Sequence, residues 1–404
     1  MGAFAKATVR DLDAAGKRVL VRVDFNVPLG PDGEVADDTR IVAALPTIRY
    51  LLEKGAAVIL MSHLGRPKKK DPGASLAPVA RRLSRLLRAE VTLAPDVVGP
   101  EVTRLAEGLA PGRVLLLENL RFYPGEEAND PEFAGQLAAL GQAYVNDAFG
   151  TAHRAHASTE GVPARLKPAV AGFLMQKELD ALGSVLEAPA RPFVAVLGGA
   201  KISGKIDVLE NLLPKLDRLI IGGGMMFTFV KARGGEIGRS LVEEDRVEMA
   251  RGVLAQAAER GLEVLIAPDC RAADSPKGGA VEVVAADRVP ADKLGVDIGP
   301  QAERLFRERL LDARTVVWNG PMGIFEVPEF AAGTLAMARA LAEATQRGAK
   351  TVIGGGDSAA AVAAAGVEAQ VTHVSTGGGA SLEFLEGRVL PGVAALDGRA
   401  GAGS

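Results

Sequence analysis

The sequence predicts an α/β protein with two domains of similar size, each built on a parallel sheet. Short apolar, β-branched runs alternate with longer segments of helical periodicity along the whole chain. One stretch punctuated by proline and glycine interrupts this alternation near the middle of the chain. The length of 404 residues is enough for two or three domains with separate cores.

Strands are predicted where apolar and β-branched residues cluster between turn signals. In the first half these runs are residues 18–27, 56–62, 91–94, 113–118 and 143–146. In the second half they are residues 193–197, 218–221, 263–267, 315–318, 351–353 and 371–374. The clearest helical patterns are residues 39–54, 76–89, 245–260 and 330–347. Parallel sheets of this kind bind ligands at the carboxyl ends of their strands.

The domain boundary is expected within residues 152–190. Phe173–Glu187 has one continuous helical pattern with proline-punctuated segments on both sides. We therefore predict a first domain of residues 1–172 and a second of residues 173–389, with Phe173–Glu187 as the connector helix. The small, polar tail of residues 397–404 is expected to fray.

Composition excludes several classes of protein. The 47 basic and 50 acidic residues give a net charge of −3, so no global field attracts nucleic acid or an anionic membrane. The only cysteine, Cys270, excludes an internal disulfide. The charged N-terminus has no signal-peptide core, and the apolar runs are too short to span a bilayer. We expect a soluble, cytoplasmic monomer without nucleic-acid or membrane partners.

Glycines cluster directly after strands in the second half of the chain. The four clusters are residues 198–199, 222–224, 354–356 and 377–379. One cluster alone is compatible with an ordinary tight turn. Four at the strand ends of one domain favour a rim that binds phosphate or a nucleotide, because backbone N–H groups and helix N-termini converge there.

The first glycine cluster begins like a P-loop but does not complete the pattern. After Lys205 the pattern requires a serine or threonine for Mg²⁺, and this chain has Ile206. Lys201 and Lys205 stand four residues apart and would share a face if a helix began early. One lysine would then meet a transferring phosphoryl group and the other a nucleotide, although exposed lysines are the simpler interpretation.

Two further polar positions in the second half have both a structural and a functional interpretation. Asp357 follows a glycine cluster at the start of a helix, where it would cap the helix or hold Mg²⁺ beside nucleotide phosphates. The loop of residues 319–323, followed by Glu326, would line a base or ribose pocket or form a simple turn.

The strand ends of the first half carry arginines instead of glycine clusters. These are Arg22, Arg40, Arg66, Arg121 and Arg154, with Asp24, Asn26 and His63 among them. Equivalent topological positions would bring the arginines to one crevice suited to a small, multiply anionic ligand. Asp24 is interpreted as a partner that orients arginines rather than as an acid–base catalyst.

Nine segments together resemble the phosphoglycerate kinase family along essentially the whole chain. In the first half they are RVDFNVP at 22–28, SHLGRP at 62–67, LENLRF at 117–122 and NDAFGTAHRAH at 146–156. In the second half they are GGAK at 198–201, IGGG at 221–224, WNGPMGIFE at 318–326, GGDS at 355–358 and STGGG at 375–379. The order and spacing of these segments make the resemblance specific.

The resemblance implies two Rossmann-like, doubly wound domains joined by the connector helix and a hinge, with residues 390–404 docked on the first domain. It also implies 3-phosphoglycerate on the first domain and ADP or ATP with Mg²⁺ on the second. The implied acid-substrate residues are Asp24, Phe25, Asn26, Arg40, His63, Arg66, Arg121 and Arg154. The implied nucleotide residues are Lys201, Lys205, Gly295, Glu326, Gly355, Gly356, Asp357 and Ser358, with Asp357 near Mg²⁺.

The reaction implied is reversible phosphoryl transfer between 1,3-bisphosphoglycerate and ADP, giving 3-phosphoglycerate and ATP. Lys201 and Arg40 would stabilise the transferring group as the domains close. Two positions depart from the family pattern: Gly204 replaces an acid, and Met226 replaces a small residue and would narrow the adenine pocket. A P-loop-like ATPase and a non-catalytic metabolite-binding protein remain alternatives.

Overall fold

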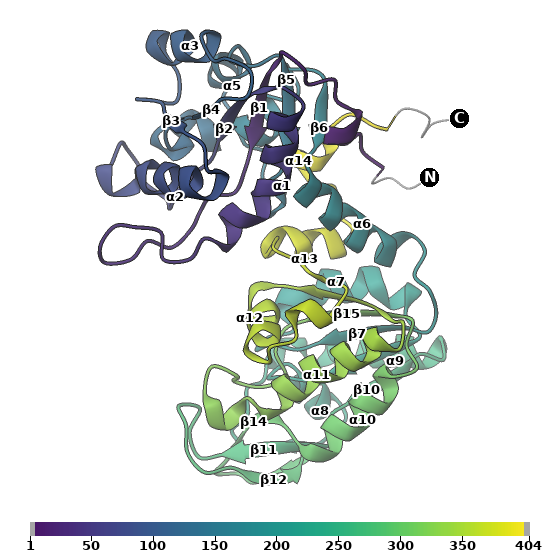
Figure 1. Ribbon diagram of the computed structural model, residues 1–404. Coiled ribbons are helices and arrows are strands. Elements are labelled where there is room, and N and C mark those ends of the chain that lie inside the picture. Colours follow the sequence, from purple (N-terminus) through teal and green to yellow (C-terminus); the bar gives the residue numbers. More distant parts are fainter. Residues whose placement is uncertain (1–4, 400–404) are drawn as a thin grey trace. The chain divides into compact units, whose positions relative to one another are not determined.

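The computed structural model describes residues 5–399 (Figure 1). The chain forms two compact units, one running to Asp180 and resuming at Val389, the other comprising Ala181–Arg388. Each unit contains one six-stranded parallel sheet with flanking helices, which confirms the predicted fold class. The division between the units falls inside helix α6 (Phe173–Glu187), whereas the sequence places the boundary ahead of it.

The first unit has the strand order β3-β4-β2-β1-β5-β6. Its strands are β1 (Arg18–Arg22), β2 (Ala57–Met61), β3 (Val91–Leu93), β4 (Val114–Leu116), β5 (Ala143–Asn146) and β6 (Ala169–Ala171). Its helices, besides the first part of α6, are α1 (Thr39–Glu53), α2 (Ala77–Leu87), α3 (Pro100–Glu107), α4 (Pro124–Glu127), α5 (Pro131–Ala138) and α14 (Pro391–Ala394). The topology reverses between β1 and β5, and a reversal of this kind opens a binding crevice at the strand ends.

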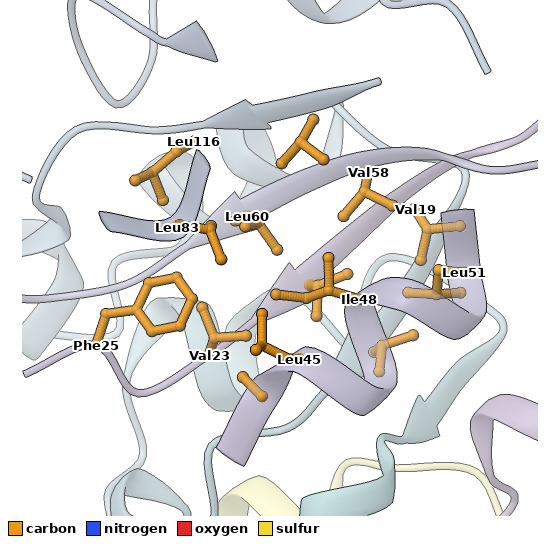
Figure 2. Packing of buried hydrophobic residues seen from close by; sticks show 14 of the residues in the cluster. Val19, Val23, Phe25, Leu45, Ile48, Leu51, Val58, Leu60, Leu83 and Leu116 are labelled. Carbon is orange, nitrogen blue, oxygen red and sulfur yellow. The ribbon is translucent and has the colours of Figure 1, made fainter. Parts of the chain in front are cut away.

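The core of the first unit lies between the sheet and α1 (Figure 2). Val19 and Val58 project from neighbouring strands toward Ile48 of α1. All five residues of β2 are buried because both faces of the sheet are covered, which explains its continuous apolar run. Each fully buried aliphatic side chain contributes about 1.5–3 kcal/mol to stability.

The second unit has the strand order β10-β8-β7-β15-β16-β17. Its strands are β7 (Phe193–Leu197), β8 (Arg218–Ile221), β10 (Glu263–Ile266), β15 (Thr315–Asn319), β16 (Lys350–Gly354) and β17 (His373–Val374). Its main helices are α7 (Ile206–Leu212), α8 (Met226–Ala232), α9 (Val247–Glu259), α10 (Pro300–Leu310), α11 (Ala332–Gln346), α12 (Gly356–Ala364) and α13 (Gly379–Leu385). The topology reverses between β7 and β15, so two of the glycine-containing loops meet at that point.

Two small sheets of the second unit are absent from the sequence prediction. One is antiparallel, with the order β12 (Glu282–Ala285), β11 (Asp269–Ala273) and β14 (Leu294–Ile298). The other pairs β9 (Glu236–Ile237) with β13 (Arg288–Val289). The antiparallel sheet contributes Gly295 and Asp297 to the wall of a cavity described below.

The C-terminal segment returns to the first unit. The Asn146 side chain donates to the carbonyl oxygen of Gly392 (3.2 Å), and Asp397 accepts hydrogen bonds from Lys167 Nζ (2.6 Å) and the Ala169 amide (2.8 Å). Fraying is therefore the wrong expectation for Asp397, while residues 400–404 lie outside the described part of the chain. Across residues 5–399, no helix has the length and apolar character that crossing a membrane requires.

Candidate active site

The strand ends of the first unit gather a basic cluster around His63. Arg22 ends β1, and its Nη2 lies 3.1 Å from His63 Nδ1, directly after β2. The pKa of His63 lies well below 6.5, first because the ring is buried and then because Arg22, Arg121, Arg154 and Arg40 surround it with positive charge. Four of the five predicted arginines therefore act on the charge of His63, although Arg40 comes from the first turn of α1 rather than from a strand end; Arg66 is not among these four.

Arg121 has one buried hydrogen-bond donor that no described residue satisfies. It lies in the short 3₁₀ turn Leu120–Phe122, and its side chain is only 3% exposed. Nη1 donates to Glu127, whereas the buried Nε has no partner among the described residues. Burial lowers the pKa of Arg121, yet a guanidinium remains charged. A buried donor of this kind is satisfied when a ligand oxygen binds.

Asp24 and Asn26 shape the loop that follows β1. Asp24 Oδ2 lies 2.5 Å from Arg40 Nη1, and its other oxygen accepts the Asn26 amide at 3.1 Å. Asn26 Oδ1 accepts a hydrogen bond from the Gly65 amide at 2.8 Å, which fixes the backbone directly before Arg66. The Arg66 side chain is exposed. Asp24 thus orients Arg40, as its position among arginines indicates.

Phe25 differs from the other predicted residues because its side chain is not available to a ligand. The ring is fully buried in the core of the first unit (Figure 2). Its amide donates to Ser62 Oγ at 2.9 Å, which fixes the loop between Asp24 and Asn26. Phe25 therefore supports the cluster from below and contributes no side-chain contact to its surface.

Three groups near Arg154 lie beside the cluster, and none of them was predicted as a site residue. Arg154 Nε lies 3.2 Å from His153 Nε2, and Thr159 Oγ1 donates to the Arg154 carbonyl at 2.8 Å. Burial, followed by the charges of Arg121, Arg22 and Arg154, lowers the pKa of His156 to about 4. The NDAFGTAHRAH segment was the available signal for His153 and His156.

The second unit contains a cavity of about 480 Å³ at the reversal point of its sheet. Its wall includes the predicted residues Gly295, Glu326 and Asp357, with backbone from Gly199, Gly223 and Gly224. Most of the remaining wall is apolar. Met226 and the 319–323 loop with Met322 were predicted to line it, whereas the other apolar residues were not: Phe227, Leu241, Leu294, Val296 and Ile324. An apolar slot with glycine backbone at one end suits a flat base attached to a phosphate chain.

The departures from the family pattern have different structural consequences. Met226 is buried and lines the cavity, as expected for a residue that narrows it. Gly204 borders open space, because a Cβ added there meets no atom within 4 Å. A missing acid at position 204 therefore leaves no cavity in the packing.

Lys201 and Lys205 do not share a helix face. Helix α7 begins only at Ile206, Lys205 ends the 3₁₀ turn Ser203–Lys205, and Lys201 is exposed before that turn. Burial lowers the pKa of Lys205 to about 8, although the nearby Asp357 carboxylate raises it. Its ammonium donates to Oδ1 of Asn319, the last residue of β15.

The loop after β16 presents the start of α12 to the cavity. Gly355 has φ of 90°, and a Cβ there would lie 2.8 Å from Asn319 Nδ2, so the position requires glycine. Gly356 and Asp357 are exposed in the first turn, where free N–H groups favour an anion. Ser358 is buried, and its Oγ accepts the Gly320 amide at 2.6 Å, so its hydroxyl fixes the neighbouring loop.

Asp357 is suited to hold Mg²⁺ only together with a nucleotide. Among residues 5–399, no group of three or more histidine, cysteine, aspartate or glutamate side chains is arranged to hold a metal ion. Mg²⁺ is commonly held by one or two carboxylates plus substrate phosphates. The exposed carboxylate of Asp357 at the cavity wall fits that arrangement.

Comparison with known proteins gives one consistent result. The family model described as phosphoglycerate kinase matches residues 9–388. The phosphoglycerate kinase of Chlorobium luteolum is 58% identical over 395 residues, which cover 97% of this chain and all of that protein. The phosphoglycerate kinase of Prosthecochloris aestuarii is 57% identical over 394 residues, covering 97% of this chain and 99% of that protein.

Solved structures agree with the sequence comparison. The phosphoglycerate kinase of Coxiella burnetii matches with a TM-score of 0.89 at 42% identity, covering 96% of this chain and 98% of that chain. The enzyme of Pyrococcus horikoshii matches with a TM-score of 0.81 at 35% identity and the same coverage. The chain therefore belongs to the phosphoglycerate kinase family, as its motifs predict, and it is a kinase.

Proposed function

We propose that the chain catalyses reversible phosphoryl transfer between 1,3-bisphosphoglycerate and ADP, which gives 3-phosphoglycerate and ATP. The observation that carries this proposal is the division of binding chemistry between the two units. The strand ends of the first unit carry arginines around a neutral histidine, and those of the second carry glycines around an apolar cavity. The named activity of the relatives supports the same reaction.

In this proposal the basic cluster binds the carboxylate and phosphate groups of the acid substrate. Arg66, Arg121 and Arg154 supply guanidinium donors, and His63 supplies a neutral one. Asp24 and Asn26 hold the loop and orient Arg40, while Phe25 acts through its backbone. The substrate is thereby recognised as a compact anion with oxygen atoms at both ends.

The nucleotide is proposed to occupy the cavity of the second unit. The base lies in the apolar slot against Gly295, and the ribose meets Glu326. The phosphates meet Lys205 and the first turn of α12, which comprises residues 355–358 with Asp357. Mg²⁺ would be held by Asp357 and the phosphates, where it would neutralise phosphate charge.

The proposed chemistry requires no general base. The attacking oxygen is already an anion, a carboxylate in one direction and a phosphate of ADP in the other. Lys201 and Arg40 would stabilise charge on the transferring phosphoryl group, which passes through a loose transition state. Because each unit would hold one substrate, transfer requires a closing step that aligns the two and excludes water.

A coupled assay of ADP formation from ATP and Mg²⁺ tests the reaction. We expect ADP formation that depends strictly on 3-phosphoglycerate. A P-loop-like ATPase would release ADP without the acid substrate, and a non-catalytic binding protein would release none. Either of those results would replace the proposal.

Arg66→Ala tests the location of the acid substrate. The variant loses one charged hydrogen-bond donor, so we expect KM for 3-phosphoglycerate to rise by about tenfold or more while KM for ATP stays constant. Arg85→Ala, an exposed arginine on α2, is the matched control and should leave both constants unchanged. An unchanged KM in Arg66→Ala would count against the basic cluster as the acid-substrate site.

A further inference from the structure

Arg22 is a buried cation whose hydrogen bonds all run to neutral acceptors. The residue is 1% exposed at the end of β1. Its Nε donates to Ser158 Oγ at 2.8 Å, Nη1 donates to the Val23 carbonyl oxygen, and Nη2 donates to His63 Nδ1 at 3.1 Å. A buried charge of this kind is costly unless an opposite charge compensates it.

The negative charge that compensates Arg22 belongs to Glu126, and Ser158 links the two side chains by hydrogen bonds. Ser158, in the helical turn Ala157–Gly161, donates its hydroxyl to Glu126 Oε1 at 2.5 Å and its amide to Glu126 Oε2 at 3.0 Å. A guanidinium only donates hydrogen bonds, so the Ser158 oxygen accepts from Arg22 and its proton points to Glu126. Glu126 is fully buried in α4, and both of its oxygens accept from Ser158.

The Arg22 guanidinium also determines which ring nitrogen of His63 carries the proton. Because Arg22 Nη2 only donates, the contact leaves no room for a proton on His63 Nδ1. A histidine with a bare Nδ1 is neutral and carries its single proton on Nε2. Burial and the surrounding arginines also hold the pKa of His63 well below 6.5, so the ring is neutral near pH 7.

We propose that Glu126, Ser158 and Arg22 form a buried chain of positioning residues that holds His63 as the neutral Nε2–H tautomer. Carboxylate and phosphate oxygens accept hydrogen bonds, so an Nε2–H group attracts them, whereas a bare Nε2 repels them. The chain therefore makes His63 selective for an anion. This inference rests on the proposed function only for the identity of that anion.

The tautomer is measured directly by ¹⁵N NMR of the histidine rings in the ligand-free full chain at about pH 7. The four histidines give few signals, and His63→Gln assigns those of His63. We expect a protonated Nε2 and a bare Nδ1. In Ser158→Ala and Glu126→Gln, Arg22 loses its anchored geometry, so a mixture of the two neutral tautomers is expected.

Tyr144→Phe is the matched control for loss of a buried hydroxyl. Tyr144 is fully buried, and its hydroxyl donates to the carbonyl oxygen of Ser158 at 2.8 Å, outside the Glu126–Ser158–Arg22 chain. We expect this variant to keep the Nε2–H tautomer. A merely structural role for Ser158 would make Tyr144→Phe and Ser158→Ala behave alike, which would overturn the proposal.

Kinetics supply the second readout. Ser158→Ala and Glu126→Gln should raise KM for 3-phosphoglycerate in inverse proportion to the remaining Nε2–H fraction, about twofold for an even mixture, and leave KM for ATP unchanged. An Nδ1–H or doubly protonated His63 in the unaltered chain overturns the inference even if every variant fails to fold. Because the NMR measurement needs neither substrate nor turnover, a failure of the proposed reaction is distinguishable from a failure of the buried chain.

Discussion

In the proposed nucleotide site, Lys205 is the residue whose protonation state binding would change most directly. Its side chain is half-buried and its ammonium is hydrogen-bonded to neutral Asn319, while the Asp357 carboxylate only partly offsets the effect of burial. The pKa of Lys205 is therefore lowered to about 8. Bound phosphates would favour the charged form, because opposite charge raises the pKa of an ammonium group.

Nucleotide binding is expected to take up a proton above about pH 8. Below the pKa of Lys205 in the free protein the ammonium is already charged, so binding is independent of pH there. Above it, the uncharged amine must gain a proton, so ADP affinity falls as pH rises. Calorimetry in two buffers with different ionisation enthalpies measures this uptake. Lys205→Met should abolish it, and Lys177→Met, an exposed lysine on α6, should retain it.

Lys201→Ala tests the group assigned to the transferring phosphoryl. Lys201 is exposed in the loop after β7, so its removal should not disturb the core. Loss of one preorganised charge donor typically lowers kcat by about 10²–10³, and we expect that loss with little change in either KM. Stopped-flow or steady-state kinetics beside Lys177→Ala would measure it. Near-normal turnover would remove Lys201 from the mechanism.

Sequence motifs predict which positions belong to a site but not which of their atoms are available. Phe25 lies in the predicted substrate segment, yet its ring belongs to the core. Ser358 lies in the predicted phosphate loop, yet its hydroxyl holds Gly320. The supporting role of Arg22 was hidden because Ser158 and Glu126 are remote from it in the chain. Such long-range hydrogen bonds leave no local pattern.

At the scale of elements, the close approach of β14 to α8 limits the width of the cavity in the second unit. A Cβ added to Gly295 would lie 2.0 Å from Phe227 Cζ, which is far inside van der Waals contact. Phe227 is itself buried, so the ring has little space into which it could turn. Glycine at position 295 therefore allows strand and helix to approach at the cavity wall.

Gly295→Ala should narrow the cavity and lower stability. Overpacking of this kind costs about 1–3 kcal/mol, and displacement of Phe227 should weaken ADP binding as well. Gly252→Ala in α9 is the control, because a Cβ there meets no atom within 4 Å. We expect the control to gain about 0.4–1 kcal/mol and to bind ADP normally. Chemical denaturation measures the stability of both variants, and titration measures their ADP affinity. Normal ADP affinity in Gly295→Ala would contradict the role of Gly295 in the cavity wall.

The elements that were predicted and those that were missed differ in their sequence pattern. The strands of the two large sheets are continuous apolar runs such as β7, and their pattern is visible without any partner. The antiparallel sheet includes β12, in which three of four residues are exposed, and β11, which carries a register shift between Arg271 and Ala272. Pairings of that kind depend on strands distant in the sequence, so no local periodicity indicates them.

At the scale of the whole molecule, each unit has an aspartate side chain that accepts a hydrogen bond from the amide of a strand residue. In the first unit Asp397 accepts the amide of Ala169 in β6 (2.8 Å) and pairs with Lys167. In the second unit Asp217 accepts the amide of Phe193 in β7 (2.7 Å) and pairs with Arg191. The pairs with lysine and arginine are half-exposed and contribute little, so the bond to the strand amide dominates.

These two aspartates allow a test of whether the units unfold separately. Asp397→Ala leaves the buried Ala169 amide without its acceptor and should destabilise the first unit by about 1–3 kcal/mol. Asp217→Ala should do the same to the second unit through Phe193. Hydrogen exchange should then accelerate around β6 in the first variant and around β7 in the second, with the other sheet protected as before. Equal acceleration of both sheets in both variants would mean that the two units open as one cooperative body, because a loss confined to one strand amide would then be shared by the whole chain.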